Sequence, residues 1–334
     1  MASTKRIVTV FGTGNQAGAV ALSLQADKVS NFHVRAVSRR PESESSKKLA
    51  AAGVEVVKAD GWNRNELTRA FAGTWAAFVN TNSDDPLFLR GDGPSELDLG
   101  RTIVDCLVSA DVEHLVYSSF SSSLEHTGGR IFIKPQEMKY QALKYAQATG
   151  HFSTVCGVYA AWYFEQFLDK STSEVCGGFP YAGDSGCFTL SLPEWGDDEL
   201  PSFLSITRDF GDLVHGILLH PEDWNGKSVP AASDVMSFAG VAAAFQRATG
   251  KEARYVPLSS WEDFGRGIPE MDEHRLLFAF TQATGGRYYG DVPTETETAS
   301  RLKKLAAEAQ GKDPENTGLF TLEEWFRISF SSGS

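Results

Sequence analysis

Short apolar runs alternate with helix-like amphipathic segments along the first half of the chain. The apolar runs have the length of buried strands, and each is followed by a segment long enough to return the chain to the same end of a sheet. Because parallel strands need such crossovers, the alternation predicts a doubly wound α/β fold, a parallel sheet with helices on both faces. The expected strands are residues 7–11, 32–37, 54–58, 75–79, 114–117 and 152–158, and the expected helices are residues 14–24, a segment from 42, 65–71, 97–109 and 136–149.

The alternation weakens after residue 158. Residues 162–201 are rich in aromatic side chains, glycine and turn signals. We therefore expect residues 1–158 to form the sheet domain and residues 159–330 to form a smaller, irregular α+β part. The smaller part is expected to bind the substrate or a partner and to interleave with the sheet. The terminal SSGS, residues 331–334, is expected to be a disordered tail. Further helices are expected near 209–220, near 235–249 and at the end of 313–330.

The first expected strand ends in a glycine-rich loop. Gly12, Gly14 and Ala17 fit Gly-x-Gly-x-x-Ala between a strand and a helix, which is the context this motif requires. The first glycine permits a tight turn, and the second lets the backbone approach a pyrophosphate at the helix N-terminus. The pattern predicts a Rossmann-type dinucleotide domain, although a plain strand–helix turn fits it too. The residues expected against the phosphates are Gly12, Thr13, Gly14, Asn15 and Gln16.

The end of the second expected strand carries two arginines and no acidic residue. In a dinucleotide fold this position lies beside the adenine ribose, where an acid favours a free 2′-hydroxyl and an arginine accommodates a 2′-phosphate. Arg39 and Arg40 therefore predict that the sheet domain, residues 1–158, binds NADP(H) rather than NAD(H), because guanidinium binds phosphate in a bidentate manner. A solvated basic turn is the alternative. Asp60, after the third strand, is expected near the adenine amino group.

Composition excludes several classes of partner. The 334 residues carry a formal net charge of −12, which disfavours binding to nucleic acid over a broad surface. No apolar run reaches the roughly 18 residues of a membrane helix, and MASTKR leads straight into a strand without a signal peptide. We expect a cytoplasmic protein, with a nuclear location left open, and no metal site. The cysteines lack CxxC spacing and are typical of a reducing compartment: Cys106, Cys156, Cys176 and Cys187.

Segments in order along most of the chain resemble the NmrA-like family, an atypical branch of the short-chain dehydrogenase/reductase superfamily. The glycine loop is similar to the family's VFGATGxQGG, but it is one residue shorter and has Ala17 where the family has glycine. The resemblance implies a nicotinamide cofactor, with the loop after the fourth strand, Asn80, Thr81 and Asn82, against it. The other similar segments are residues 37–39, 57–60, 78–82, 114–119, 138–150, 208–211, 226–230 and 321–325.

Reductases of the wider superfamily use serine, tyrosine and lysine, in which the lysine binds the nicotinamide ribose and the tyrosine acts as an acid. Tyr140 and Lys144 match the superfamily's YxxxK spacing, and Ser118 or Ser119 ends the fifth strand. These residues would complete a catalytic triad.

The register of this helix favours a different lysine. Counted back from the Thr149-Gly150 pair, the family's lysine falls on Lys139 and its tyrosine on Pro135. Lys144 lies five residues further, about 140° around the helix, so both lysines cannot face the nicotinamide. We therefore expect Lys139, with Ser118 or Ser119, to be catalytic, and interpret the Tyr140–Lys144 match as chance.

Aromatic side chains gather after the sixth strand. They either line a substrate pocket over the nicotinamide or pack the core between the two parts. The residues assigned to the pocket are Trp162, Tyr163, Phe164, Phe179 and Tyr181.

Two functions are consistent with these features. The first is an NADPH-dependent reductase of a small organic substrate, a carbonyl, enone or imine. The second is a non-catalytic NADP(H) redox sensor whose ligand regulates a protein partner. The missing tyrosine favours the sensor, whereas the intact lysine and the aromatic residues favour the reductase. The oligomeric state stays open.

Overall fold

The computed structural model describes residues 5–89, 92–181, 183–184 and 186–330. Seven parallel strands form one sheet in the order β11-β6-β5-β4-β1-β2-β3, which confirms the doubly wound fold. The order reverses between β1 and β4, where a crevice opens at the carboxyl ends of the strands. The strands are β1 (Arg6–Phe11), β2 (Phe32–Ser38), β3 (Glu55–Lys58), β4 (Thr74–Val79), β5 (His114–Ser119), β6 (Thr154–Ala160) and β11 (Ser228–Ala231).

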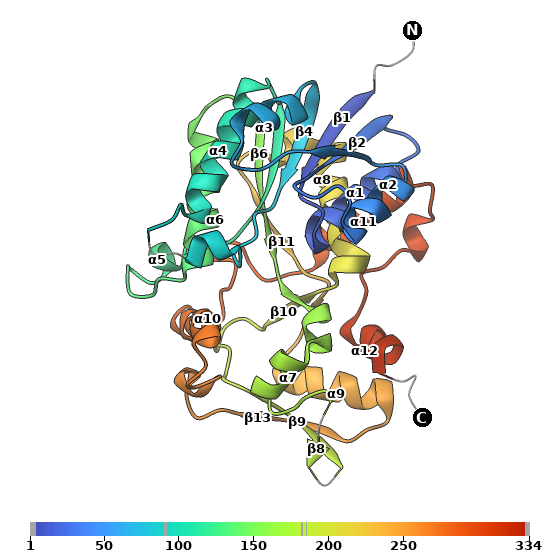
Figure 1. The fold of residues 1–334 in the computed structure, drawn as a ribbon. Helices are drawn as coiled ribbons and strands as arrows, with labels where there is room; N and C mark the ends of the chain where they lie inside the picture. The colour runs from blue at the N-terminus through green and yellow to red at the C-terminus, as the bar shows by residue number, and fades with distance from the viewer. Residues whose placement is uncertain (1–4, 90–91, 182, 185, 331–334) are drawn as a thin grey trace.

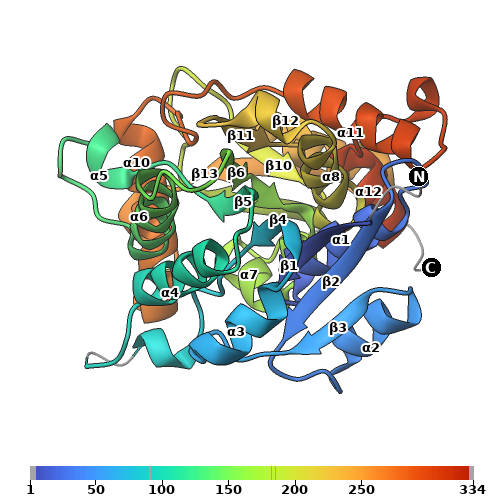
Figure 2. The same cartoon turned by 90° about the horizontal axis from the view of Figure 1, so that it is seen from above.

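Helices cover both faces of this sheet (Figure 2). One layer contains α3, α4 and α6, and the other contains α1, α8 and α11, which pack against one another. Helix α2 lies beside β3, and α5 is a short helix. The helices are α1 (Asn15–Gln25), α2 (Glu44–Ala51), α3 (Arg64–Phe71), α4 (Glu96–Ser109), α5 (Ser123–His126), α6 (Lys134–Ala148), α8 (Gly211–Leu219) and α11 (Glu297–Ala309).

The seventh strand comes from outside residues 1–158. β11 is short and contains Pro230, which an edge strand tolerates because one side of it needs no ladder hydrogen bonds. Together with α8 and α11, it returns the later part of the chain to the sheet. The six expected strands all lie within two residues of observed ones, whereas β11 was not predicted. Residues 331–334 lie outside the described residues.

A second part of the chain lies beyond the carboxyl ends of the strands (Figure 1). It has its own core of interlocking rings, among them Phe167, Phe203, Phe245 and Phe326. Two small sheets, β12-β10-β7 and β13-β9-β8, contribute side chains to this core. The elements are β7 (Trp162–Tyr163), β8 (Gly183–Asp184), β9 (Cys187–Leu192), β10 (Ser202–Leu204), β12 (Asp234–Val235), β13 (Ala253–Pro257), α7 (Lys170–Val175), α9 (Phe238–Thr249), α10 (Asp272–Ala283) and α12 (Leu322–Phe330).

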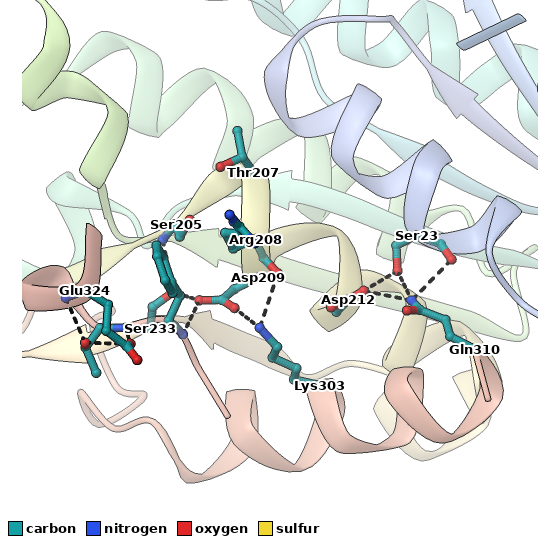
Figure 3. A network of polar contacts seen from close by, with 12 residues as sticks. Ser23, Ser205, Thr207, Arg208, Asp209, Asp212, Ser233, Lys303, Gln310 and Glu324 are labelled. Carbon is teal, nitrogen blue, oxygen red and sulfur yellow. Dashed lines mark hydrogen bonds and ion pairs between the residues drawn. The ribbon is translucent and has the colours of Figure 1, made fainter. Parts of the chain in front are cut away.

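A buried ion pair joins α8 to α11 (Figure 3). Asp209, in the turn before α8, accepts hydrogen bonds from the Lys303 ammonium, the Ser233 hydroxyl and the backbone N–H of Phe320. Both charged side chains are at least nine-tenths buried. Burial raises the pKa of Asp209, and the positive charge of Lys303 opposes that rise. The carboxylate therefore holds three separate segments of the second half of the chain together.

Ser23, His215 and Asp27 form a hydrogen-bonded chain that links α1 to α8. His215 Nε2 lies 2.9 Å from Asp27, and His215 Nδ1 lies 3.2 Å from Ser23. The order matches a hydrolase triad, but the Ser23 hydroxyl donates to Asp212 at 2.6 Å and accepts from the Gln310 amide. This serine is buried, and its proton is donated to Asp212 rather than to His215. The network therefore cross-links helices α1, α8 and α11 and is not arranged as a hydrolase triad.

Asp27 should make stability depend on pH in the acid range. Burial opposes its ionisation, but hydrogen bonds from His215, Ser30 and Val29 outweigh it and lower the pKa of Asp27 to about 2. Because the unfolded value is about 3.9, this stabilisation is present above that pH and is lost as pH falls through about 2. The free energy of unfolding, measured in urea, should therefore fall more steeply for the wild type than for Asp27→Asn as the pH is lowered from about 4 to about 2. Parallel curves would contradict the assignment.

Candidate functional site

The carboxyl ends of β1, β2, β4 and β5 border a cavity of about 700 Å³, at the point where the strand order reverses. Its wall brings together every residue that the sequence assigned to a dinucleotide, although these come from separate segments of the chain. They are Gly12, Thr13, Gly14, Asn15, Gln16, Arg39, Arg40, Asp60, Asn80, Thr81, Asn82 and Lys139.

The glycine loop leaves the first turn of α1 without a side-chain cap. Gly12 has a φ of +104°, a conformation that favours glycine, and its N–H donates to the carbonyl of Val37. Gly14 is the N-cap, and because glycine has no side chain it makes no side-chain cap hydrogen bond to the N–H groups of this turn. By contrast, Ser43 and Ser95 cap α2 and α4. Uncapped N–H groups at the edge of a cavity are what phosphate oxygens bind, so the loop fits a pyrophosphate.

The opposite end of the cavity carries the two arginines. Arg39 is half-exposed, and its Nη2 lies 3.1 Å from Oδ2 of Asp85, on the loop after β4. Asp60 accepts a hydrogen bond from the N–H of Trp62 at 3.0 Å and so shapes its own turn. Arg39 thus carries the positive charge that a 2′-phosphate would need, but its guanidinium already forms an ion pair with the Asp85 carboxylate.

Lys139, on α6, is buried in the cavity wall. Its ammonium donates to Glu96 at 2.6 Å and to the carbonyl and hydroxyl oxygens of Thr81. The side chains of Lys139 and Glu96 are 6% and 3% exposed, so little solvent weakens the pair. Burial lowers the pKa of Lys139, and the negative charge of Glu96 opposes that change. Glu96 was not predicted, because an acid in the first turn of a helix is ordinary.

The Tyr140–Lys144 pair lies outside the described lining of the cavity. The Tyr140 hydroxyl donates to Glu125 at 2.7 Å, and the Lys144 ammonium lies over the Tyr140 ring. Pro135, which the sequence register predicts at the tyrosine position, lines the cavity instead. Lys139 and Lys144 thus point to different surroundings, as their spacing on the helix predicts.

Only one of the two candidate serines faces the cavity. Successive strand residues point to opposite sides of a sheet, and Ser118 lines the cavity whereas Ser119 does not. The Ser119 hydroxyl donates to the adjacent carbonyl of Phe120. Of these two serines, the structure therefore places only Ser118 beside the cavity.

A second cavity, of about 270 Å³, adjoins the first. Four residues, Asp84, Phe120, Pro135 and Tyr163, line both cavities. The wall is mainly apolar and rich in aromatic side chains, and α10 adds Glu273 and His274, which the sequence analysis did not predict. The other aromatic lining residues are Trp162, Trp195, Phe264, Phe278 and Tyr288.

The structure brings two of the five aromatic residues that the sequence assigned to a pocket to the wall of the second cavity. Trp162 and Tyr163 line the second cavity, because they form β7 and pair with β10. Phe164 and Phe179 are fully buried in the aromatic core of the second part. Tyr181 is 41% exposed, and its hydroxyl donates to the carbonyl of Leu168. Aromatic residues satisfy a core and a pocket equally well, so sequence spacing does not separate these roles.

Within the described residues, no cluster of three or more histidine, cysteine or acidic side chains is arranged to hold a metal ion. No described helix combines the length and apolar character needed to cross a membrane.

The chain is similar to proteins of known sequence and structure over nearly its whole length. The NmrA-like oxidoreductase lnbB of Aspergillus flavus is 70% identical over 331 residues, which cover 98% of this chain and 99% of that one. The structure of NmrA, a negative transcriptional regulator, in complex with NADP has a TM-score of 0.71 at 22% identity, covering 98% of this chain and 96% of that one. The Citrobacter sp. triphenylmethane reductase with NADP(H) has a TM-score of 0.66 at 17% identity, covering 97% and 100%. The profile of the NmrA-like family matches residues 3–317, and with the close relative this shows that the chain belongs to the NmrA-like family.

Proposed function

We propose that this protein is a reductase that binds NADP(H) in the large cavity and reduces a small organic substrate, a carbonyl, enone or imine, in the aromatic cavity. The junction of the two cavities at four shared residues carries the proposal, because reductant and substrate must meet there. When bound, the reduced dinucleotide supplies a hydride. The close relative's name as an oxidoreductase supports this function, and the neighbours solved with NADP(H) support the cofactor.

Each end of the dinucleotide has a matching set of residues. Residues 12–16 would bind the pyrophosphate through backbone N–H groups. Arg39 and Arg40 would bind the 2′-phosphate, and Asp60 would face the adenine. Asn80, Thr81, Asn82 and Lys139 would line the nicotinamide ribose.

Two measurements test the reductase. Calorimetry with NADPH should give saturable binding to the purified chain. NADPH oxidation should then be followed with a panel of aryl ketones, enones and cyclic imines. Reduction of any member supports the enzyme, and absence of NADPH binding contradicts both the cofactor and the reaction.

A non-catalytic NADP(H) sensor that regulates a protein partner is the second candidate. The observation that favours it is Pro135, which lines the cavity where the superfamily's acidic tyrosine would lie. Tight NADP(H) binding without turnover of any panel member would favour this function.

We also propose a reducing compartment, the cytoplasm or the nucleus. The four cysteines are all unpaired, and burial raises the pKa of Cys156 and of Cys176 to about 12, which keeps these thiols protonated.

Arg39→Ala should weaken NADPH binding by about 1.5–3 kcal/mol, because a charge-assisted hydrogen bond to the 2′-phosphate is lost. NADH, which lacks this phosphate, should bind the variant almost as it binds the wild type. Calorimetry with both dinucleotides measures the difference. Equal losses for the two would exclude the 2′-phosphate role.

Asp85→Asn should have the opposite effect. Asp85 holds Arg39 in an ion pair at 3.1 Å and adds negative charge near the expected 2′-phosphate. Its neutralisation should tighten NADPH binding by up to about 1 kcal/mol, the usual strength of a partly exposed pair. NADH binding should change less, and weaker NADPH binding by the variant would show that Asp85 orients Arg39 rather than competing for it.

A further inference from the structure

We infer that Tyr163 is the proton donor of the proposed reduction, and that Gln16 of the glycine loop positions its hydroxyl. The inference rests on the proposed function. It assigns the role of proton donor to Tyr163, because Pro135, at the expected tyrosine position, has no acidic side-chain proton to donate. Tyr163 reaches the site from a different element, β7, beyond the end of the sixth sheet strand.

Tyr163 lies where the two cavities meet. Parallel pairing with Leu204 of β10 fixes its backbone, and the side chain lines both cavities. Of the other residues shared by the cavities, Phe120 and Pro135 have no polar side-chain atom and Asp84 carries a carboxylate. Tyr163 is thus the shared residue with a hydroxyl proton to give.

The hydrogen bonding of Tyr163 leaves that proton available. The amide nitrogen of Gln16 donates to the Tyr163 oxygen at 2.6 Å, so the hydroxyl acts as an acceptor in this contact. Among the described residues, no acceptor is recorded for the Tyr163 proton itself. Partial burial raises the pKa of Tyr163, and the hydrogen bond from Gln16 lowers it. The Gln16 amide therefore stabilises the Tyr163 phenolate that forms when the proton leaves.

Neighbouring donors are less suited. The Lys139 ammonium is engaged by Glu96 and Thr81. The Tyr288 hydroxyl, in the substrate cavity, already donates to the carbonyl of Ala160 at 3.1 Å. Ser118 lines the first cavity but is absent from the lining of the second, and an alcohol is a far weaker acid than a phenol.

The step balances with the groups named. The substrate C=X bond, where X is oxygen or nitrogen, gains a hydride at carbon from the reduced dinucleotide, which is oxidised. The Tyr163 O–H bond breaks, and its proton forms the new X–H bond. The phenolate that remains accepts the N–H of Gln16 and regains a proton from water.

The first test compares Tyr163→Phe with Tyr140→Phe, the same change at a tyrosine that lines neither cavity. With acetophenone as the probe, Tyr163→Phe should slow NADPH oxidation by about 10²–10⁴-fold, the usual contribution of a general acid. Calorimetry should show that Tyr163→Phe still binds NADPH, and Tyr140→Phe should react at the wild-type rate. A wild-type rate for Tyr163→Phe would overturn the inference, whereas failure of the wild type to bind NADPH would refute the proposed function itself.

The second test does not depend on turnover. The infrared carbonyl band of acetophenone bound with oxidised NADP should lie at lower frequency in the wild type than in Tyr163→Phe, because a donated hydrogen bond weakens the C=O bond. In Gln16→Glu the new carboxylate accepts the Tyr163 proton, so the band should move toward that of Tyr163→Phe although the tyrosine is present. The same band in wild type and Tyr163→Phe would overturn the inference.

Discussion

Lys139→Met is expected to destabilise the protein by about 3–5 kcal/mol and to lower turnover by about 10²-fold or more. Methionine fills a similar volume but leaves the Glu96 carboxylate buried at 3% exposure without its cation. The Thr81 carbonyl loses the same donor. Turnover falls because the nicotinamide ribose would lose a fixed ammonium, and a displaced dinucleotide reacts slowly.

Lys144→Met is the matched control for this prediction, because Lys144 lies on the same helix outside the cavity lining. Urea unfolding and NADPH oxidation should both stay near wild type. The double variant Lys139→Met/Glu96→Gln removes the unpaired charge, so it should regain most of the stability but not the activity. Loss of activity in Lys144→Met, with Lys139→Met active, would restore the Tyr140–Lys144 pair.

Lys303→Met is expected to reduce the free energy of unfolding by about 3–5 kcal/mol, the usual effect of removing one partner of a buried ion pair. The Asp209 side chain is fully buried, and without Lys303 its charge is uncompensated. The Ser233 hydroxyl and the Phe320 N–H would remain as donors, but they carry no formal charge. Because Asp209 joins three segments, the loss should loosen the contact of α11 with α8 (Figure 3).

The neighbouring residue provides the control. Lys304 is 42% exposed and pairs with Glu315 at 3.6 Å, so Lys304→Met should change the free energy of unfolding by less than about 1 kcal/mol. Hydrogen exchange should also speed up in α11 of Lys303→Met before it does so in the central strands. Equal stability of the two variants would show that Lys303 contributes no net charge stabilisation to the fold.

The alternation of apolar runs and helical segments was sufficient to predict the first six sheet strands and the doubly wound fold. Each signal of that kind is local, since a strand or helix displays its buried face within its own residues. The glycine loop and the paired arginines could also be found in the sequence, because each motif consists of residues that are adjacent or nearly adjacent in the chain. Counting along one helix separated Lys139 from Lys144 for the same reason.

Contacts between distant segments carried no comparable signal. β11 is too short and proline-containing to be read as a strand, and Glu96 resembles any acid at a helix start. The aromatic residues after β6 divide between core and cavity according to what packs on them from β10 and α10.

By itself, the sequence determined the parallel sheet, the glycine loop after β1 and the side chains that face one cavity at its edge. Only the tertiary structure decided that Tyr163 meets Gln16, that Glu96 holds Lys139, and that a second cavity adjoins the first. The physical reason is that local periodicity records which face of an element is buried. Which elements meet there is settled only when all apolar faces are buried together and each buried polar group finds its partner.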